Sequence, residues 1–127
     1  MGATYKGGSP TYRSLHDNVE EMKKDPRYHF QDGYFGPKHK GSHFAHDLFF
    51  DDPIAAAKAF YDKIAYGGIE NKTGEDNWTT KMKDGTYVNF RIHTSSEGSP
   101  AVQIDIKDSN DDAGIECHKI HFSKPKK

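Results

Sequence analysis

Three segments between Asp84 and Phe122 alternate polar and apolar side chains with a period of two, and this pattern limits what the chain can fold into. Successive side chains of a β-strand point to opposite faces of a sheet, so the alternation predicts strands with one buried face. The turn dipeptide Asp84-Gly85 precedes the first segment and favours a hairpin. The residues expected to face the core are Val88, Phe90 and Ile92; Val102, Ile104 and Ile106; and His118, Ile120 and Phe122.

The N-terminal half is expected to contain two helices. Leu15, Val19 and Met22 have helical spacing after the capping residue Ser14, which predicts a helix over 14–24. An acidic cap followed by proline at Asp52-Pro53 predicts a second helix that runs to about residue 65. Its expected buried stripe is Ile54, Ala57, Phe60, Tyr61 and Ile64.

These elements predict a single α+β domain over residues 1–127, with two main helices packed on an antiparallel sheet of about four strands. Residues 78–82 alternate as well and are expected to form the first strand. We expect a flexible lead-in over 1–13, a helical half over 14–68, a sheet half over 75–122 and a mobile tail over 123–127.

Charge and cysteine content narrow the classes of function. With 18 basic and 19 acidic residues, the formal net charge of −1 argues against broad adhesion to nucleic acid, so a nuclease would need a local basic patch. The single cysteine excludes an intramolecular disulfide and a Cys-rich zinc site. We expect neither a signal peptide nor a membrane span, because no apolar run is long enough.

The side chains opposite the predicted core face carry an unusual set of functional groups. Imidazoles can transfer protons near neutral pH, and guanidinium and ammonium groups can stabilise a phosphate. An ordinary solvated sheet face is the competing interpretation, and the pattern alone does not decide between them. The residues concerned are Arg91, His93, Gln103, Asp105, Lys119 and His121.

Several short motifs in this region resemble a known family. They are Asp84-Gly85-Thr86, Phe90-Arg91, the serine-rich link over 95–102, Asp105-Ile106 and Lys119-Ile120-His121-Phe122. Together they are similar to the closing segment of the C-terminal toxin domains of bacterial polymorphic toxins, which contact-dependent inhibition and Rhs-type effectors carry. The resemblance covers about the C-terminal half of the chain. It implies a ribonuclease with the barnase/colicin-type arrangement of helices on an antiparallel sheet.

A ribonuclease of this kind needs no cofactor, because the ribose 2′-hydroxyl is the nucleophile. We assign proton transfer to His121, on which the strand parity and the family motif agree, with His93 as its candidate partner. Lys119 and Arg91 are suited to hold the phosphate. Asp105 is expected either to orient a histidine or lysine or to form a structural salt bridge. The candidate substrate-binding residues are Ser95, Ser99, Gln103 and Lys40.

A second histidine group lies at His39, His43 and His46. On a helix these spacings would place three imidazoles on one face, as a zinc site could use. Gly36-Pro37 and Gly41 argue against such a helix, so we interpret the segment as a surface loop that in a nuclease would lie beside the active face.

The sequence therefore favours an antibacterial toxin domain that cleaves RNA, with tRNA as the substrate suggested by the family. The family implies export within a larger effector, action in the cytoplasm of a target bacterium and neutralisation by a cognate immunity protein. Whether a host factor is also needed is left open. The alternatives are a non-catalytic module that binds RNA or protein, and a metal-dependent nuclease built on the second histidine group.

Overall fold

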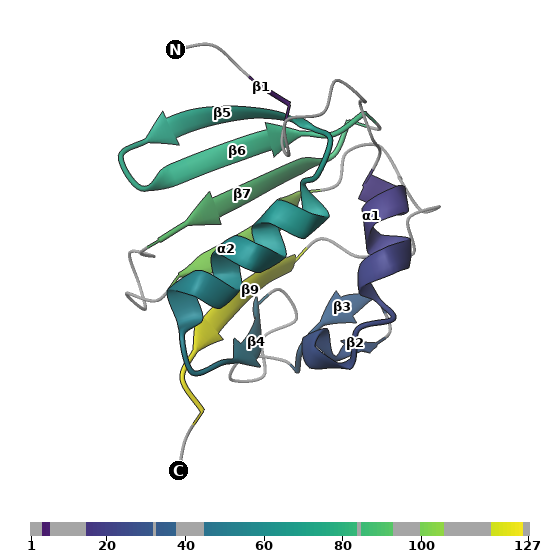
Figure 1. Cartoon of the computed structure of the whole chain (residues 1–127), viewed down its shortest axis with the longest axis vertical. Helices are drawn as coiled ribbons and strands as arrows, with labels where there is room; N and C mark the ends of the chain where they lie inside the picture. Colours follow the sequence, from purple (N-terminus) through teal and green to yellow (C-terminus); the bar gives the residue numbers. More distant parts are fainter. Residues whose placement is uncertain are drawn as a thin grey trace.

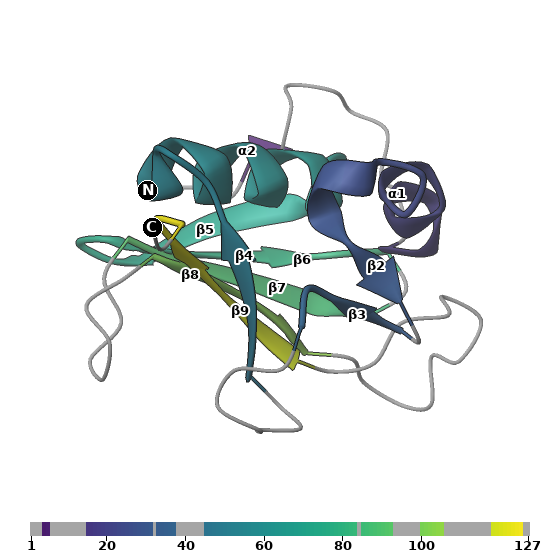
Figure 2. The same cartoon turned by 90° about the horizontal axis from the view of Figure 1, so that it is seen from below.

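Two helices lie on one face of a mixed β-sheet in the part of the chain that the computed structural model describes (Figure 1, Figure 2). This part comprises residues 4–5, 15–31, 33–37, 45–83, 85–92, 100–105 and 118–125. The sheet has the strand order β1-β5-β6-β7-β8-β9-β4. Six of these strands have five or six residues, and the two-residue β1, Thr4–Tyr5, is added at one edge. The predicted α+β class is therefore confirmed.

Strands β5 to β9 form one antiparallel series, as the alternating segments predicted. Phe90 pairs with Val102, and Val102 pairs with Ile120, so the apolar side chains of three strands form one row beneath a helix. Val88, Ile104 and the residues of this row are at most 4% exposed. The bounds are β5 Ile69–Gly74, β6 Asn77–Lys81, β7 Tyr87–Arg91, β8 Ala101–Asp105 and β9 His118–Ser123.

The expectation of a purely antiparallel sheet of about four strands is wrong at both edges. Strand β4, Ala45–Phe49, pairs with β9 in parallel, although we interpreted its sequence as a loop. Its buried positions are His46 and Leu48, and a histidine at a core position hides the apolar alternation. Strand β5 was missed because its sequence is polar and mostly exposed, so its pairing with β6 leaves no hydrophobic pattern.

Helix α2, Pro53–Ile64, lies across the middle of the sheet (Figure 1). The side chain of Asp52 accepts a hydrogen bond from the Ala55 N–H at 3.2 Å, which satisfies one of the free amides at the helix start. The predicted stripe is buried at Ala57, Phe60, Tyr61 and Ile64. Ile54 is instead 45% exposed. It lies in the first turn of α2, so the other residues of the stripe all lie on its C-terminal side.

Helix α1, Leu15–Met22, packs beside the end of α2, and its predicted apolar residues Leu15, Val19 and Met22 are buried. The Asn18 side-chain amide donates to the Ile64 and Tyr66 carbonyls at 2.8 and 2.9 Å. These carbonyls belong to the last turn of α2 and the residues after it, where intrahelical donors are missing. Asn18 therefore joins the two helices by satisfying backbone acceptors.

A short hairpin follows α1. Asp25 caps the 3-10 helix η1, Pro26–Tyr28, and the hairpin follows as β2, Phe30–Gln31, and β3, Tyr34–Phe35. Gly33 in the turn has a φ of 89°, which glycine adopts at low cost. Tyr28 and Phe35 each contact the ring of Phe60 edge-on with centroids 5.0 Å apart, so this aromatic segment is part of the core.

Three of the expected segments differ in the structure. The lead-in over 1–13 contributes β1, which pairs with β5, and the helical half over 14–68 contains β2, β3 and β4. Strand β9 extends to Ser123, the first residue of the expected mobile tail. Among the helices that the structure describes, none is long and apolar enough to cross a membrane.

Candidate functional site

The candidate site is the face of the sheet opposite α2, where strand register gathers the predicted polar residues. One row across the strands runs from Arg91 through Ala101 to His121. The next row pairs Gln103 with Lys119. We call this surface the polar face and define it by Arg91, Gln103, Asp105, Lys119, His121 and, as argued below, Asp47.

Ala101 separates Arg91 from His121 in the first row. Because each strand adds about 4.8 Å, their Cα atoms are about 10 Å apart. Ala101 is only 3% exposed, so the space above its small side chain is covered in this structure. Arg91 is exposed, so its guanidinium can turn toward this gap. The row therefore places a cation and an imidazole on either side of a position that is wide enough for a phosphate but would have to be uncovered to bind one.

Asp105 lies at the other end of the polar face. It pairs with Tyr87 and is four residues from Ala101 along β8, which corresponds to about 13 Å. It is much nearer to Lys119, the neighbour of Gln103. If Asp105 orients another side chain, the strand register therefore favours Lys119 over His121 as its partner.

Accessibility differs sharply within the polar face. Arg91 and Asp105 are exposed and Lys119 is partly buried, whereas His121 is only 4% exposed. A cation can therefore contact a nucleic-acid backbone directly. Proton transfer between His121 and a large substrate requires the imidazole to become more exposed than it is in this structure.

Asp47 is a member of the polar face that the sequence did not reveal. In the parallel pairing of β4 with β9, its Cα partner is His121, so a carboxylate follows the imidazole in the row. A carboxylate beside a histidine can fix the tautomer and orientation of the ring. The alternation of His46 and Leu48 was the available signal for β4, but local sequence does not specify a parallel partner so distant in the chain.

Several predicted site residues fall outside the part of the chain that the structure describes: His93, Ser95, Ser99, Lys40, His39 and His43. The zinc interpretation of the second histidine group assumed a helix, and that assumption is wrong for His46, which lies in β4. Within the described ranges, no three His, Cys, Asp or Glu side chains are grouped closely enough to hold a metal ion.

His118 lies on the core side of the sheet, as its parity predicted. It belongs to β9, which has β8 on one side and β4 on the other, and it is fully buried. His46 of β4 is 2% exposed on the same side of the sheet. Two imidazoles are thus enclosed behind the polar face.

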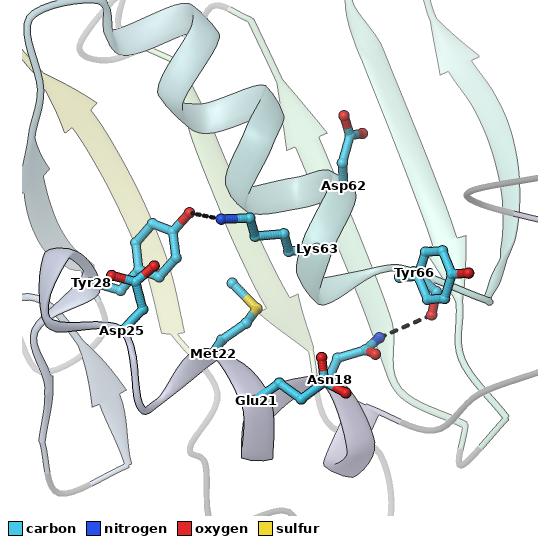
Figure 3. A pocket seen from close by; sticks show the side chains of 8 residues that line it. All are labelled: Asn18, Glu21, Met22, Asp25, Tyr28, Asp62, Lys63 and Tyr66. Carbon is cyan, nitrogen blue, oxygen red and sulfur yellow. Dashed lines mark hydrogen bonds between the residues drawn. The ribbon is translucent and has the colours of Figure 1, made fainter.

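A cavity of about 480 Å³ lies on the opposite side of the molecule, between α1, η1 and the end of α2 (Figure 3). Lys63 donates to the Tyr28 hydroxyl at 3.2 Å within it. The hydrogen bond from the Arg27 side chain lowers the pKa of Asp25 to about 2, so that carboxylate is ionised at neutral pH. Carboxylates outnumber the single lysine in the lining, which disfavours a phosphate ligand. None of the predicted site residues lines this cavity.

Comparison with known proteins did not assign the chain to a family. No protein-family model matches the sequence. Searches of curated proteins and of solved structures also gave no match. The class that the fold defines is an α+β protein with helices on one face of a mixed sheet, and the arguments about function therefore depend on the polar face itself.

Proposed function

We propose that this chain is an RNA-cleaving toxin domain that binds and cleaves its substrate at the polar face. The observation that carries the proposal is the row in which Arg91 and His121 flank Ala101. The row supplies a cation for the phosphate and an imidazole for proton transfer, which are the groups that metal-independent RNA cleavage requires.

In this mechanism the ribose 2′-hydroxyl attacks the adjacent phosphorus, and the bond to the 5′-oxygen breaks. His121 exchanges a proton with one of these oxygens, with His93 as the proposed partner, and Asp47 orients the His121 ring. Arg91 and Lys119 stabilise the charge on the phosphorane, while Asp105 positions Lys119. Gln103, Ser95, Ser99 and Lys40 are proposed to hold the ribose or the flanking phosphates.

The resemblance in the C-terminal half also supports a proposal about the substrate, the route of export and the partner of the domain. We infer that the substrate is tRNA, that the domain is exported within a larger effector, and that it acts in the cytoplasm of a target bacterium. A cognate immunity protein would protect the producing cell. These statements are supported by the motifs around Phe90-Arg91 and Lys119-Ile120-His121-Phe122.

A non-catalytic RNA-binding module is the second candidate, and the 4% exposure of His121 favours it. A buried imidazole can be a structural part of the sheet, while Arg91 and Lys119 bind phosphates without any reaction. The two candidates predict the same binding surface. They differ in whether RNA is cut and in whether His121 is needed.

Incubation of the purified protein with tRNA distinguishes them. We expect products with 2′,3′-cyclic phosphate ends, loss of cleavage in His121→Ala, and a loss of about a hundredfold or more in Arg91→Ala. Lys24→Ala is the matched control, because Lys24 is an exposed cation next to α1 on the helix side. A folded His121→Ala protein with full activity would remove His121 from the mechanism. Binding without cleavage by the wild-type protein would support the second candidate.

A further inference from the structure

Another cavity, of about 400 Å³, lies where the β2–β3 hairpin meets the end of β4, and Figure 2 shows these elements side by side. Small-molecule sites have volumes of about 300–1,000 Å³, so the cavity is large enough for a ligand. Its lining includes His29 and Gln31 next to the hairpin, and Asp47 and Phe49 of β4. Apart from Asp47, none of these residues has a role in the mechanism above.

The cavity adjoins the polar face at Asp47, which belongs to both. Phe49 is two residues further along β4, about 7 Å away, and has the same parity as Asp47. The register partner of Asp47 is His121, about 4.8 Å away in the neighbouring strand. The cavity therefore lies one strand away from the imidazole to which we assign proton transfer.

The side chains of the cavity are accessible, unlike the centre of the polar face. His121 and Ala101 are at most 4% exposed. Phe49 is 46% exposed, and His29 and Gln31 are exposed as well. A ligand can therefore reach these three side chains as they stand in this structure.

Phe49 supplies a flat apolar surface at the side of the cavity. Its ring makes no aromatic contact with another residue in the described part of the chain. The face of the sheet to which its parity assigns it is otherwise polar, so packing in the core does not account for an aromatic residue there. An exposed ring of this kind is suited to stacking on a nucleobase, because every base has a π-face.

The polar side chains around Phe49 can bond the edge of a base. Gln31 offers both donors and an acceptor, and a neutral imidazole at His29 offers one of each. Neither side chain has a hydrogen-bond or ion-pair partner among the residues that the structure describes. The backbone of His29 is fixed from both sides, because its N–H donates to the Pro26 carbonyl at 3.3 Å and its carbonyl accepts from the Gly36 N–H at 3.2 Å.

The backbone of β4 adds a further donor. The Phe50 N–H donates to the Ser123 carbonyl of β9 at 2.9 Å. The Asp47 N–H points the other way and donates to the Pro37 carbonyl at 2.9 Å. Because these directions alternate along a strand, the Phe49 N–H also points away from β9, toward the hairpin side. No hairpin or loop carbonyl within the described ranges accepts from it.

The charge of the lining disfavours a phosphate inside the cavity. Asp47 brings a carboxylate, and the described residues of the lining include neither lysine nor arginine. A strand from a partner protein would find little free edge on β4, because the Asp47 N–H is already bonded to Pro37. An aromatic ring surrounded by uncharged donors and acceptors matches a nucleobase better than either ligand.

We propose that this cavity binds a base of single-stranded RNA whose backbone continues onto the polar face. Phe49 stacks on the base, while Gln31, His29 and the Phe49 N–H bond its edge. This inference rests on the proposed function, but only on the RNA binding that both of its candidates share and not on cleavage.

NMR titration of the isotope-labelled protein with the four nucleoside 5′-monophosphates tests the proposal, and ribose 5-phosphate is the control that lacks a base. We expect at least one nucleotide to shift the amide signals of Gln31, Leu48 and Phe49, and ribose 5-phosphate to leave them unchanged. A deoxytrinucleotide that contains this base has no 2′-hydroxyl to react. It should bind at least about tenfold more tightly than the monophosphate, because its backbone adds contacts with the polar face.

Variants identify the residues that hold the base. Phe49→Ala should weaken binding of the nucleotide about fivefold or more, whereas Phe49→Tyr keeps the ring and should bind as the wild type does. Gln31→Ala, at an exposed position, should also weaken binding, and it decides the question if Phe49→Ala does not fold. Ile54→Ala is the matched control, because Ile54 is 45% exposed on α2 and does not line this cavity.

Three results would overturn the proposal: no shift of the cavity amides at millimolar nucleotide, equal shifts with ribose 5-phosphate, or unchanged binding in folded Phe49→Ala. Equal affinities for the monophosphate and the trinucleotide would also contradict it, since the ligand would then be a free nucleotide. Cleavage of tRNA by the wild-type protein is measured separately. Base binding without cleavage would remove the ribonuclease activity and keep this site, whereas cleavage without base binding would do the reverse.

Discussion

The Tyr61 hydroxyl on α2 forms a hydrogen bond with the Thr80 hydroxyl on β6, and both side chains are buried. Burial raises the pKa of Tyr61 far above its usual range, and the hydrogen bond and charge of Glu70 act in the same direction. The hydroxyl is therefore neutral at neutral pH. The same ring stacks on Phe90 at 5.2 Å, so the helix is joined to the sheet by polar and aromatic contacts at one residue.

Tyr61→Phe is expected to lower the free energy of unfolding by about 1–3 kcal/mol, because it leaves the buried Thr80 hydroxyl without this partner. Thr80→Val should cost a similar amount. The double variant should cost less than the sum of the two, since no hydroxyl of the pair then remains. Urea unfolding measures all three values, and additive losses would show that the two hydroxyls are not coupled.

The elements that the sequence predicted well are those with a local physical signal. Asp52 caps the start of α2, and Pro53 has the fixed φ that suits the first helical turn. In the strands around Phe90 and Val102, apolar and polar side chains alternate clearly because one face is buried. The placement of Arg91, Lys119 and His121 on one face followed from the same parity.

The remaining features depend on contacts that local sequence does not encode. Strand β5 is held by its pairing with β6 and has few apolar residues of its own. The parallel pairing that places Asp47 beside His121 joins distant segments, and the burial of His46 and His118 depends on hydrogen bonds to the hairpin. Strand parity predicts which face a histidine occupies, but it does not predict that other elements cover that histidine.

Asn18→Ala is expected to destabilise the protein by about 1–3 kcal/mol, because the Ile64 and Tyr66 carbonyls lose their common donor. Asn18→Asp should be more harmful still, since a carboxylate would face two carbonyl oxygens. Lys24→Ala, an exposed change just beyond α1, should stay within about 0.5 kcal/mol of the wild type. Thermal or urea unfolding tests this order, and equal stabilities for the three variants would contradict the link between the helices.

Substitution of Gly68 or Gly85 by alanine should lower the free energy of unfolding, for a different reason at each position. A Cβ on Gly68 would overlap the Thr80 side chain and would lie 2.6 Å from Sδ of Met82 and 2.9 Å from the Lys81 carbonyl, so Gly68→Ala should cost about 1–3 kcal/mol or more. Gly85 has open space around it but a φ of 86°, so Gly85→Ala should cost about 1–2 kcal/mol through backbone strain.

Asparagine separates these two causes, because it tolerates a left-handed backbone but is larger than alanine. Gly85→Asn should recover much of the stability that Gly85→Ala loses, whereas Gly68→Asn should be worse than Gly68→Ala. The free energies of unfolding of the four variants provide the comparison. If asparagine changed the free energy of unfolding in the same direction relative to alanine at both positions, steric overlap at Gly68 and backbone strain at Gly85 would not be the separate causes.

An acidic immunity protein is expected to bind the polar face or a surface beside it. The polar face carries two cations, Arg91 and Lys119, beside two carboxylates, Asp47 and Asp105, so we expect an acidic partner to contact the two cations, which would also contact RNA. Arg91→Glu should therefore weaken partner binding by about 2 kcal/mol or more, while Lys24→Glu on the helix side should have little effect. Calorimetry with the purified partner measures both variants.

Competition decides whether this partner inhibits by occlusion. If inhibitor and substrate use one surface, saturating partner should displace labelled tRNA from the protein. Co-expression of the partner should also restore growth in cells that the proposed toxin activity arrests. The His121→Ala protein, which we expect to be inactive, allows the binding measurement without cleavage. Equal tRNA binding with and without the partner would show that inhibition acts at a distance from the polar face. The cleavage assay with wild-type protein would remain the separate test of the ribonuclease activity.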